Sequence, residues 1–380
     1  MKKTLFLIPA LFLLFLPALG WGQEVHQEFQ ELVKAKVLEV VEEYDRIIMG
    51  TQVSTTVQKL RIQLLSGDKV NQVVTLENDL LVLSPNEIIY VNRLISFDGT
   101  EYYIFKDVER RPALLALLVI FIVLIVALAR WQGVRAILSL GLSIGAILFV
   151  LIPALLAGYS PALTSLVISA VILSAILFLT HGIRPHVVIT FFGTFAAVAV
   201  TCLITYIWVS WMRLTGFSSD ASVYLNFAMG GTLDLGSLLL GSIIIGLLGV
   251  LDDVCITQAS VVQELRRANC DLGLKELYLR AIQVGRDHVG SLVNTLALAY
   301  VGAALPLILL YASSGSDLWL SVNQEVIAAE ILRIVVGSIG LILAVPITTL
   351  VAAWDFKDKH LHALSENHAG GDHHHHHHHH

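Results

Sequence analysis

From residue 112 onward the sequence consists of long apolar runs separated by short polar segments. The first run, 113–129, has no polar side chain at all. Each run approaches the ~20 residues that a helix needs to cross the hydrocarbon core of a bilayer. Because only helices satisfy their own backbone there without closing a barrel, helices are expected. The pattern predicts an all-α polytopic bundle of about seven transmembrane helices, at 113–129, 136–157, 161–180, 187–209, 238–262, 289–311 and 328–352.

Residues 21–111 follow a different pattern, in which apolar and polar positions alternate. Val33, Ala35 and Val37 alternate with lysines, for example, and such a period of two is typical of half-buried strands. Five short strands are expected, around 33–37, 59–64, 70–76, 88–94 and 102–105. This number of strands in so short a segment favours a small all-β domain, an OB-like barrel, which we interpret as an adaptor or gating domain.

The two ends of the chain do not belong to the fold. Residues 1–20 combine two lysines, an apolar run and small residues before Trp21, which predicts a cleaved signal peptide. An uncleaved short anchor is the alternative, and both readings place residue 22 outside the cytoplasm. Residues 370–380 are interpreted as a spacer and histidine tag, so the histidine run is no argument for a metal site. The remaining boundaries are a transmembrane domain at 112–354 and a cytoplasmic tail at 355–369.

The basic residues predict the orientation. With residue 22 outside, only Arg213 falls in an outer loop between helices, and cytoplasmic loops carry an excess of Lys and Arg. The predicted cytoplasmic set is Arg130, Arg135, Arg184, Arg266, Arg267, Lys275, Arg280, Arg286, Lys357 and Lys359. We therefore expect a bacterial plasma (inner) membrane protein whose N-terminal domain lies outside and whose C-terminus is cytoplasmic. A stretch at 272–284 with helical apolar spacing is a candidate amphipathic connector on the membrane surface.

Composition narrows the class of protein. Hydrophobic residues make up 56% and charged residues 14% of the chain, which exceeds what a soluble domain of this length hides from water. The net charge of -6 gives no reason to expect nucleic acid as a partner, whereas the lipid bilayer is one. The spans contain no metalloprotease, nucleophile-elbow or phosphate-loop motif, so we expect no enzyme, cofactor or metal. A protein partner at the β-domain and a homo-oligomer remain open.

Two adjacent carboxylates are the most costly residues of the predicted spans. Asp252 and Asp253 lie within the fifth span, and an ionised carboxylate at that depth costs several kcal/mol. Such a group is either protonated or faces a cation or water, and adjacent like charges make double ionisation harder. A carboxylate that gains and loses a proton at this depth is the physical basis of ion coupling. In the alternative reading the span ends at Asp252 and both carboxylates lie in cytoplasmic water.

Other polar residues of the last three spans are candidates for the same role. Ser242, Gly246, Gly249, Asp253 and Thr257 recur at steps of three and four and share one helix face. The ion-coupling candidates are Asp252, Asp253, Thr257, Asp287, His288, Asn294 and Thr295.

Each of the remaining polar candidates also has a structural reading. Asp287 is equally explained as a helix cap, and His288 as a boundary histidine. Glu330 and Arg333 are expected to pair at the outer side, with Asp234 as an external partner of Arg333. A structural pairing is the favoured reading for both, and a functional role of these intramembrane ions is the alternative.

Three segments of the predicted membrane domain stand out: Gly-Val-Leu-Asp-Asp-Val-Cys-Ile-Thr-Gln (249–258), Gly-Arg-Asp-His-Val-Gly-Ser-Leu-Val-Asn-Thr (285–295) and Val-Gly-Ser-Ile-Gly-Leu-Ile-Leu-Ala-Val-Pro-Ile-Thr-Thr (336–349). Together they resemble the YibE/F family of bacterial polytopic membrane proteins. The resemblance implies a polytopic membrane domain and carries over no catalytic residues.

A second resemblance concerns only the last three helices. The segment 246–267, with its Asp-Asp pair and a polar end, is similar to the fourth transmembrane helix of resistance-nodulation-division transporters and to SecD and SecF. In those exporters the paired aspartates move protons, which implies the same role for Asp252 and Asp253. Their large periplasmic domains have no counterpart in this sequence, so substrate handling does not carry over.

Two hypotheses for function follow. The first is an ion-coupled, proton-driven transporter or exporter that uses the intramembrane Asp-Asp pair, with the β-domain gating or binding outside. The second is a non-transporting scaffold or accessory subunit for envelope assembly that docks partners through the β-domain. A pair of aspartates lining a water-accessible cavity favours the first hypothesis, and one buried against a packed helix favours the second.

Overall fold

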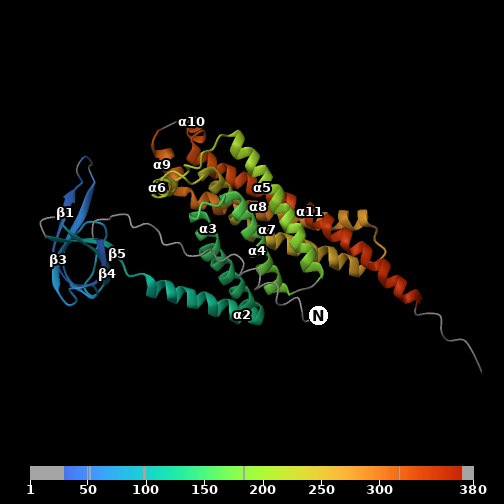
Figure 1. The fold of residues 1–380 in the computed structure, drawn as a ribbon, viewed down its shortest axis with the longest axis horizontal. Helices are drawn as coiled ribbons and strands as arrows, with labels where there is room; N and C mark the ends of the chain where they lie inside the picture. Colours follow the sequence, from blue (N-terminus) through green and yellow to red (C-terminus); the bar gives the residue numbers. More distant parts are fainter. Residues whose placement is uncertain are drawn as a thin grey trace, which may run out of the picture. The chain divides into compact units, whose positions relative to one another are not determined.

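The computed structural model describes residues 30–48, 50, 53–96, 100–182, 185–315 and 317–369. The predicted signal peptide and the spacer with its tag lie outside the described residues. The chain divides into two compact units, one comprising residues 19–128 and the other beginning at Ala129. Each unit is described by itself (Figure 1).

The first unit contains one five-stranded antiparallel sheet. The strands are β1 (Gln30–Ile47), β2 (Ser54–Leu64), β3 (Val73–Asn78), β4 (Ile88–Ile95) and β5 (Glu101–Val108). Their order in the sheet is β3-β2-β1-β4-β5. The long first strand pairs with β4 through its first half and with β2 through its second, and two register shifts bend it where both partners meet. The five strands lie where the alternating pattern predicts them, and β1 is much longer than expected.

The alternation has the expected physical consequence. Side chains from β1, β2, β3, β4 and β5 form one buried apolar cluster, because alternate residues of each strand point to the same side. Its members are Val33, Ala35, Val37, Leu60, Ile62, Leu64, Leu76, Leu83, Ile89, Val91 and Phe105. A small half-barrel therefore encloses its own core.

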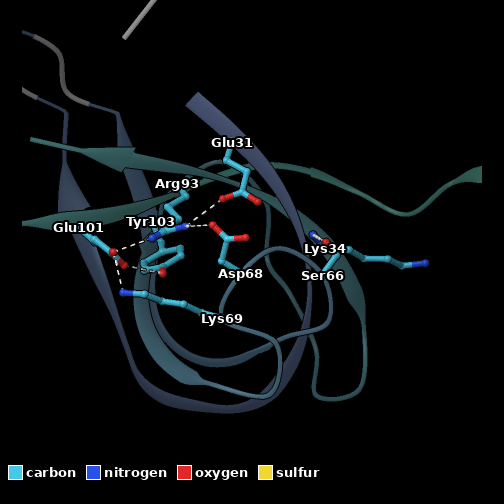
Figure 2. A network of polar contacts seen from close by, with 8 residues as sticks. All are labelled: Glu31, Lys34, Ser66, Asp68, Lys69, Arg93, Glu101 and Tyr103. Carbon is cyan, nitrogen blue, oxygen red and sulfur yellow. Dashed lines mark hydrogen bonds and ion pairs between the residues drawn. The ribbon is translucent and has the colours of Figure 1, made fainter. Parts of the chain in front are cut away.

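An ion-pair network lies on this half-barrel (Figure 2). Arg93 on β4 donates to Glu31 at 2.9 Å and to Glu101 at 2.7 Å, and only 9% of its side chain is exposed. Lys69 and Tyr103 also donate to Glu101, at 2.6 and 3.0 Å. These donors hold the pKa of Glu101 at about 2, below its ordinary value of 4.5. The network ties β1, β4 and β5 to the loop after β2.

A second buried carboxylate connects the sheet to the first helix. Glu109 follows β5 and has a side chain that is 8% exposed. It pairs with Lys34 at 3.2 Å and accepts hydrogen bonds from Tyr90 at 2.6 Å and from Arg111 Nε at 2.7 Å. Arg111 is the first residue of α2 (Arg111–Ala146), so the start of that helix is held by β1 and β4.

Helix α2 is interrupted. Arg130 has φ 50° and ψ -128°, which is not a helical conformation, and a π-helical turn η1 (Ile147–Leu151) and α3 (Ile152–Leu156) follow. Together α2, η1 and α3 form 46 residues, about 69 Å at 1.5 Å per residue, whereas the hydrocarbon core is about 30 Å thick. The break at Arg130 falls between the first two predicted spans.

The remaining long helices are α4 (Pro161–His181), α5 (Pro185–Trp211), α7 (Leu235–Ala268), α8 (Leu274–Ala303) and α11 (Glu325–Ala369). Three short helices, α6 (Asp220–Ala228), α9 (Leu305–Ser313) and α10 (Leu318–Val322), occur in the segments between them. Helix α8 begins at Leu274, so the segment predicted as a surface connector is the first part of this helix rather than a separate element. Helices α8 and α9 meet at an angle of 60° around Ala304, just before Pro306.

Helices α7 and α11 lie at the centre of the second unit. Helix α7 contacts α4, α5, α8 and α11, and α11 contacts α5 and α8 as well (Figure 1). Their interface buries Leu247, Leu251, Val336 and Leu341, and small residues allow close approach. A Cβ on Gly337, for example, would lie 2.7 Å from Leu247 Cδ2.

Five helices of the described chain are long and apolar enough to cross a membrane, and the bent pair α8–α9 gives a sixth. The prediction of about seven differs from this number for one reason: 113–129 and 136–157 occur here in one continuous stretch, 111–156. The second unit is a helical membrane domain.

Candidate functional site

Asp252 is buried in the interior of the helical unit. It lies near the midpoint of α7, and its residue is 4% exposed. Its Oδ1 atom has no hydrogen-bond partner within the described part of the chain. Flanking residues Leu248, Leu251, Val254 and Cys255 belong to the apolar core. A carboxyl group is thus held in apolar surroundings without a counter-charge.

Asp253 points away from this interior. It is exposed on the surface of the helical unit, because adjacent residues of a helix are separated by about 100°. Thr257 and Gly249 share its open side, and a Cβ added to Gly249 would contact nothing within 4 Å. The face predicted from the steps of three and four is therefore the outward face of α7 at these positions. The two adjacent aspartates do not form one site.

Threonines line the buried side of α5 opposite α7 and α11. Thr190, Thr194, Thr201 and Thr205 are at most 2% exposed and recur at steps of four and seven. The hydroxyl groups of Thr194, Thr201 and Thr205 each donate to the carbonyl four residues earlier, at 2.7 to 2.9 Å. Their lone pairs therefore remain available toward the neighbouring helices. None of these threonines was among the predicted site residues, although their spacing is visible in the sequence.

The inner part of this interface is polar and tightly packed. Cys255, one turn from Asp252, lies against the side chains of Thr194 and Thr348. Thr348 is fully buried, and its Oγ1 has no hydrogen bond of standard geometry to the described residues. A Cβ on Gly193 would lie 3.2 Å from the Thr348 Cα, so α5 and α11 are in backbone contact here. Two unpartnered polar groups, on Asp252 and Thr348, thus lie on helices that pack together.

Gln258 ties three helices together. Its Nε2 atom donates to the Ala281 carbonyl of α8 at 2.9 Å and to the Thr349 hydroxyl of α11 at 2.7 Å. The residue is 3% exposed, and a Cβ on Gly285 would lie 2.7 Å from its Oε1. Gln258 was not among the predicted site residues, because the sequence does not reveal which side of α7 faces its neighbours.

A pocket of about 670 Å³ lies where these three helices meet. Two of the predicted candidates, Thr257 and His288, line it from α7 and α8. The described residues that line it are Val254, Thr257, Gln258, Val261, Gln283, Val284, Gly285, His288, Ser291 and Val345. Neither aspartate is part of the lining.

The other inner candidates lie on α8. Asn294 and Thr295 are exposed, and the Thr295 hydroxyl donates to the Ser291 carbonyl at 3.0 Å. Asp287 belongs to the same helix, beside His288. Asn294 and Thr295 share α8 with the pocket but are not among its described lining residues, and they are separate from the interior position of Asp252.

The predicted outer pair exists. Arg333 donates to Glu330 at 2.5 Å, and its guanidinium lies 5.9 Å from the centre of the Tyr300 ring. Asp234 instead caps the N-terminus of α7 by accepting from the Ser237 backbone at 3.0 Å. Its hydrogen bonds to the Ser237 hydroxyl and backbone lower the pKa of this carboxyl. The structure therefore gives Asp234 a capping role rather than the predicted pairing with Arg333.

A carboxylate that the sequence analysis missed fastens the outer end of α11. Glu325 accepts from the backbone N–H of Thr215 and Gly216, at 2.8 and 2.6 Å, and from the Thr215 hydroxyl at 2.8 Å. Its partners are about 110 residues away in the sequence, so no local pattern indicates the contact. Glu325 holds the loop after α5 against the start of α11.

The described residues contain no group of three or more His, Cys, Asp or Glu side chains placed to hold a metal ion. The chemistry of the interior is therefore that of one unpartnered carboxyl group, threonine hydroxyls and a glutamine amide. This arrangement can take up a proton or a small cation, and nothing in it resembles a nucleophile with its base.

No curated protein and no solved structure matches the chain. The family model described as YibE/F-like protein matches residues 117–358, which include α4, α5, α7, α8 and α11 with Asp252 and the pocket. The match covers more than half of the sequence and agrees with the resemblance of the three segments on α7, α8 and α11. The chain belongs to the YibE/F-like protein family.

Proposed function

We propose that the chain is an ion-coupled, proton-driven membrane transporter or exporter in which Asp252 carries the coupling proton. The observation behind the proposal is the buried, unpartnered Oδ1 of Asp252 at the middle of α7. A permanently ionised carboxylate there costs several kcal/mol, so the group is neutral whenever it is buried. It becomes charged only when water or a cation reaches it. Coupling a protonation to a change of helix packing is what a proton-driven transporter requires.

The two adjacent aspartates differ in position. Asp252 is the proton carrier, whereas Asp253 lies on the outward face of α7, away from the interior that Asp252 enters. The threonines of α5 and Thr348 supply hydroxyl groups along the interface that Asp252 enters. Thr257 and His288 belong to the pocket, and Asn294 and Thr295 to the exposed face of α8.

The proposed arrangement in the membrane has seven spans. Support comes from the 46 residues of 111–156, which are too long for one crossing and are broken at Arg130. The positive-inside distribution then places the β-domain outside the cytoplasm in the bacterial inner membrane. We also infer an OB-like barrel, because β1 pairs with both β2 and β4 and because β3 lies against β5.

A second candidate function is the non-transporting scaffold or accessory subunit. The observation that favours it is that neither aspartate lines the pocket, while Asp252 is packed among core residues. In this reading the polar groups only hold helices together, and the half-barrel docks envelope partners. A buried carboxyl that serves packing alone is replaceable by an amide of the same size, and this separates the two functions.

Proton flux in proteoliposomes tests the assignment. With a potassium gradient and valinomycin setting the potential, the wild-type protein should acidify or alkalise a lumen that contains a pH-sensitive dye. Asp252→Asn should abolish this flux because an amide does not exchange a proton, whereas the matched Asp253→Asn should retain most of it. Equal flux from wild type and Asp252→Asn, or no wild-type flux above empty liposomes, would favour the scaffold.

A further inference from the structure

We propose that the pocket between α7, α8 and α11 binds an amphipathic molecule with an uncharged polar head. This inference rests on the proposed function in one respect, since it identifies the pocket as the transporter's substrate site. Its volume of about 670 Å³ falls in the range of small-molecule sites, about 300 to 1,000 Å³.

The lining has an apolar and a polar part. Val254, Val261, Val284 and Val345 offer methyl groups, which favour an alkyl or other apolar portion of a ligand. The polar part presents the amides of Gln258 and Gln283, the hydroxyls of Thr257 and Ser291, and the imidazole of His288. Both donors and acceptors are therefore present, which favours a head rich in hydroxyl or amide groups.

The described lining residues carry no fixed charge. They include no Asp, Glu, Lys or Arg, and His288 is the one titratable group among them. A phosphate, carboxylate or quaternary ammonium group would have no fixed counter-charge among these residues, and an ion that loses water without a counter-charge is costly. A neutral head carries no such cost.

The contacts that hold the three helices around the pocket do not involve all of its polar groups. Gln258 Nε2 donates to the Ala281 carbonyl and to the Thr349 hydroxyl. These two bonds fix the amide plane and leave Oε1 beside Gly285. At Gly285 a side chain would meet Gln258 Oε1 and Val345 Cγ1, each at 2.7 Å. The absence of a side chain at Gly285 therefore lets α8 approach α7 and α11 at the pocket wall.

The position of the pocket links it to Asp252. Val254 lines the pocket two residues after Asp252 on α7, and Gln258 reaches α11 one residue from the unpartnered Thr348. Movement of α7 against α11 changes both the pocket wall and the environment of the carboxyl group. Occupancy of the pocket and protonation of Asp252 are thus coupled through one helix pair.

Photocrosslinking tests the site. A glucoside with a benzophenone-bearing alkyl chain is added to the full chain in lipid nanodiscs, irradiated, and the modified peptides are mapped by mass spectrometry. We expect modification within 254–261 of α7 and 283–291 of α8, competed by unlabelled alkyl glucoside. Competition by an alkyl sulfate or an alkyl trimethylammonium should be weaker by about tenfold or more, equivalent to about 1.4 kcal/mol.

Two variants provide the matched comparison. Ser291→Trp fills the pocket and should remove the competed crosslink, whereas Leu298→Trp adds the same ring on an exposed part of α8 and should leave it unchanged. Crosslinking that is not competed, or that Ser291→Trp leaves unaltered, overturns the inference. A disulfide between two chains at Ser291→Cys, in a Cys270→Ser background, also overturns it, because a second copy would then cover the pocket.

The outcome is independent of the proton-carrier assignment. Asp252→Asn should keep the competed crosslink even where it abolishes proton flux, because Asp252 does not line the pocket. Loss of flux with an intact crosslink supports both assignments. If the crosslink fails while the flux depends on Asp252, only the assignment of the pocket is rejected. If the crosslink is intact while the flux does not depend on Asp252, only the assignment of the proton carrier is rejected.

Discussion

At the scale of single residues, the interior of the helical unit distinguishes partnered from unpartnered polar groups. Gln258 and Thr349 are buried and hydrogen-bonded to one another, whereas Asp252 Oδ1 and Thr348 Oγ1 are buried without such bonds. Buried polar groups are usually satisfied, so an exception on a helix at membrane depth calls for a functional explanation. Replacing the partnered residue should affect stability, and replacing Asp252 should affect ion handling.

Gln258→Leu tests this distinction for the partnered residue. Loss of the bonds to Ala281 and Thr349 should lower the free energy of unfolding by about 1 kcal/mol, since hydrogen bonds between membrane helices contribute about 0.6 kcal/mol each. Reversible unfolding in mixed micelles measures the change. The half-buried Gln263 on the same helix provides the control, Gln263→Leu, which should shift stability less. An equal change in the free energy of unfolding of both variants would contradict the role of Gln258 in joining three helices.

At the scale of elements, two networks give the half-barrel its register. Arg93 and Lys69 gather around Glu101, and Glu109 joins the sheet to the start of α2. Both carboxylates accept charge-assisted hydrogen bonds, which are stronger than bonds between neutral groups. The strands are therefore held by ionic contacts at both ends of β5 and by apolar packing in the core.

The Glu101 network predicts acid sensitivity of β4 and β5. Because the folded pKa of Glu101 is about 2 and its ordinary value is 4.5, the stabilisation is fully present above about pH 4.5 and is lost as the pH falls toward 2. Hydrogen exchange of the β4 and β5 peptides, corrected for its intrinsic pH dependence, should accelerate over that interval. Glu101→Gln should remove most of the pH dependence. The same acceleration in that variant would assign the effect to other groups.

At the scale of the whole molecule, the sequence predicts where the elements lie better than which faces meet. Five strands and the apolar helices follow from periods of two and from run lengths. The orientation of α7 did not follow, because a membrane helix packs through large apolar residues as readily as through small and polar ones. Its face of small and polar residues therefore did not have to be the packed face. The sequence therefore could not indicate that Asp252 is inside and Asp253 outside.

Contacts between segments far apart in the sequence could not be predicted either. Glu325 binds Thr215 and Gly216, and Gln258 binds Thr349, across about 110 and 91 residues. The threonines of α5 had a visible spacing, but a hydroxyl bonded to its own helix looks the same in a sequence whether it faces lipid or protein. The sequence therefore indicated some of the polar residues of the interior, but not which of them bond to one another.

Seven spans and the proposed orientation are tested by thiol labelling of spheroplasts with an impermeant maleimide. Leu80→Cys in the β-domain should react at once, since Leu80 is 73% exposed and the proposed orientation puts the β-domain outside the cytoplasm. The native Cys270 and Trp131→Cys should react only after the membrane is opened. Trp131→Cys in a Cys270→Ser background that resists labelling on both sides would show that 111–156 crosses only once.

The most direct test of the central claim is carbodiimide labelling of Asp252. Dicyclohexylcarbodiimide modifies carboxyl groups that are protonated in apolar surroundings, so the purified protein in nanodiscs should be labelled on α7, and labelling should decline as the pH rises. Mass spectrometry of wild type, Asp252→Asn and Asp253→Asn locates the adduct. The account predicts an adduct that disappears in Asp252→Asn and persists in Asp253→Asn. Labelling that is absent in wild type, or that follows Asp253 instead, would contradict it.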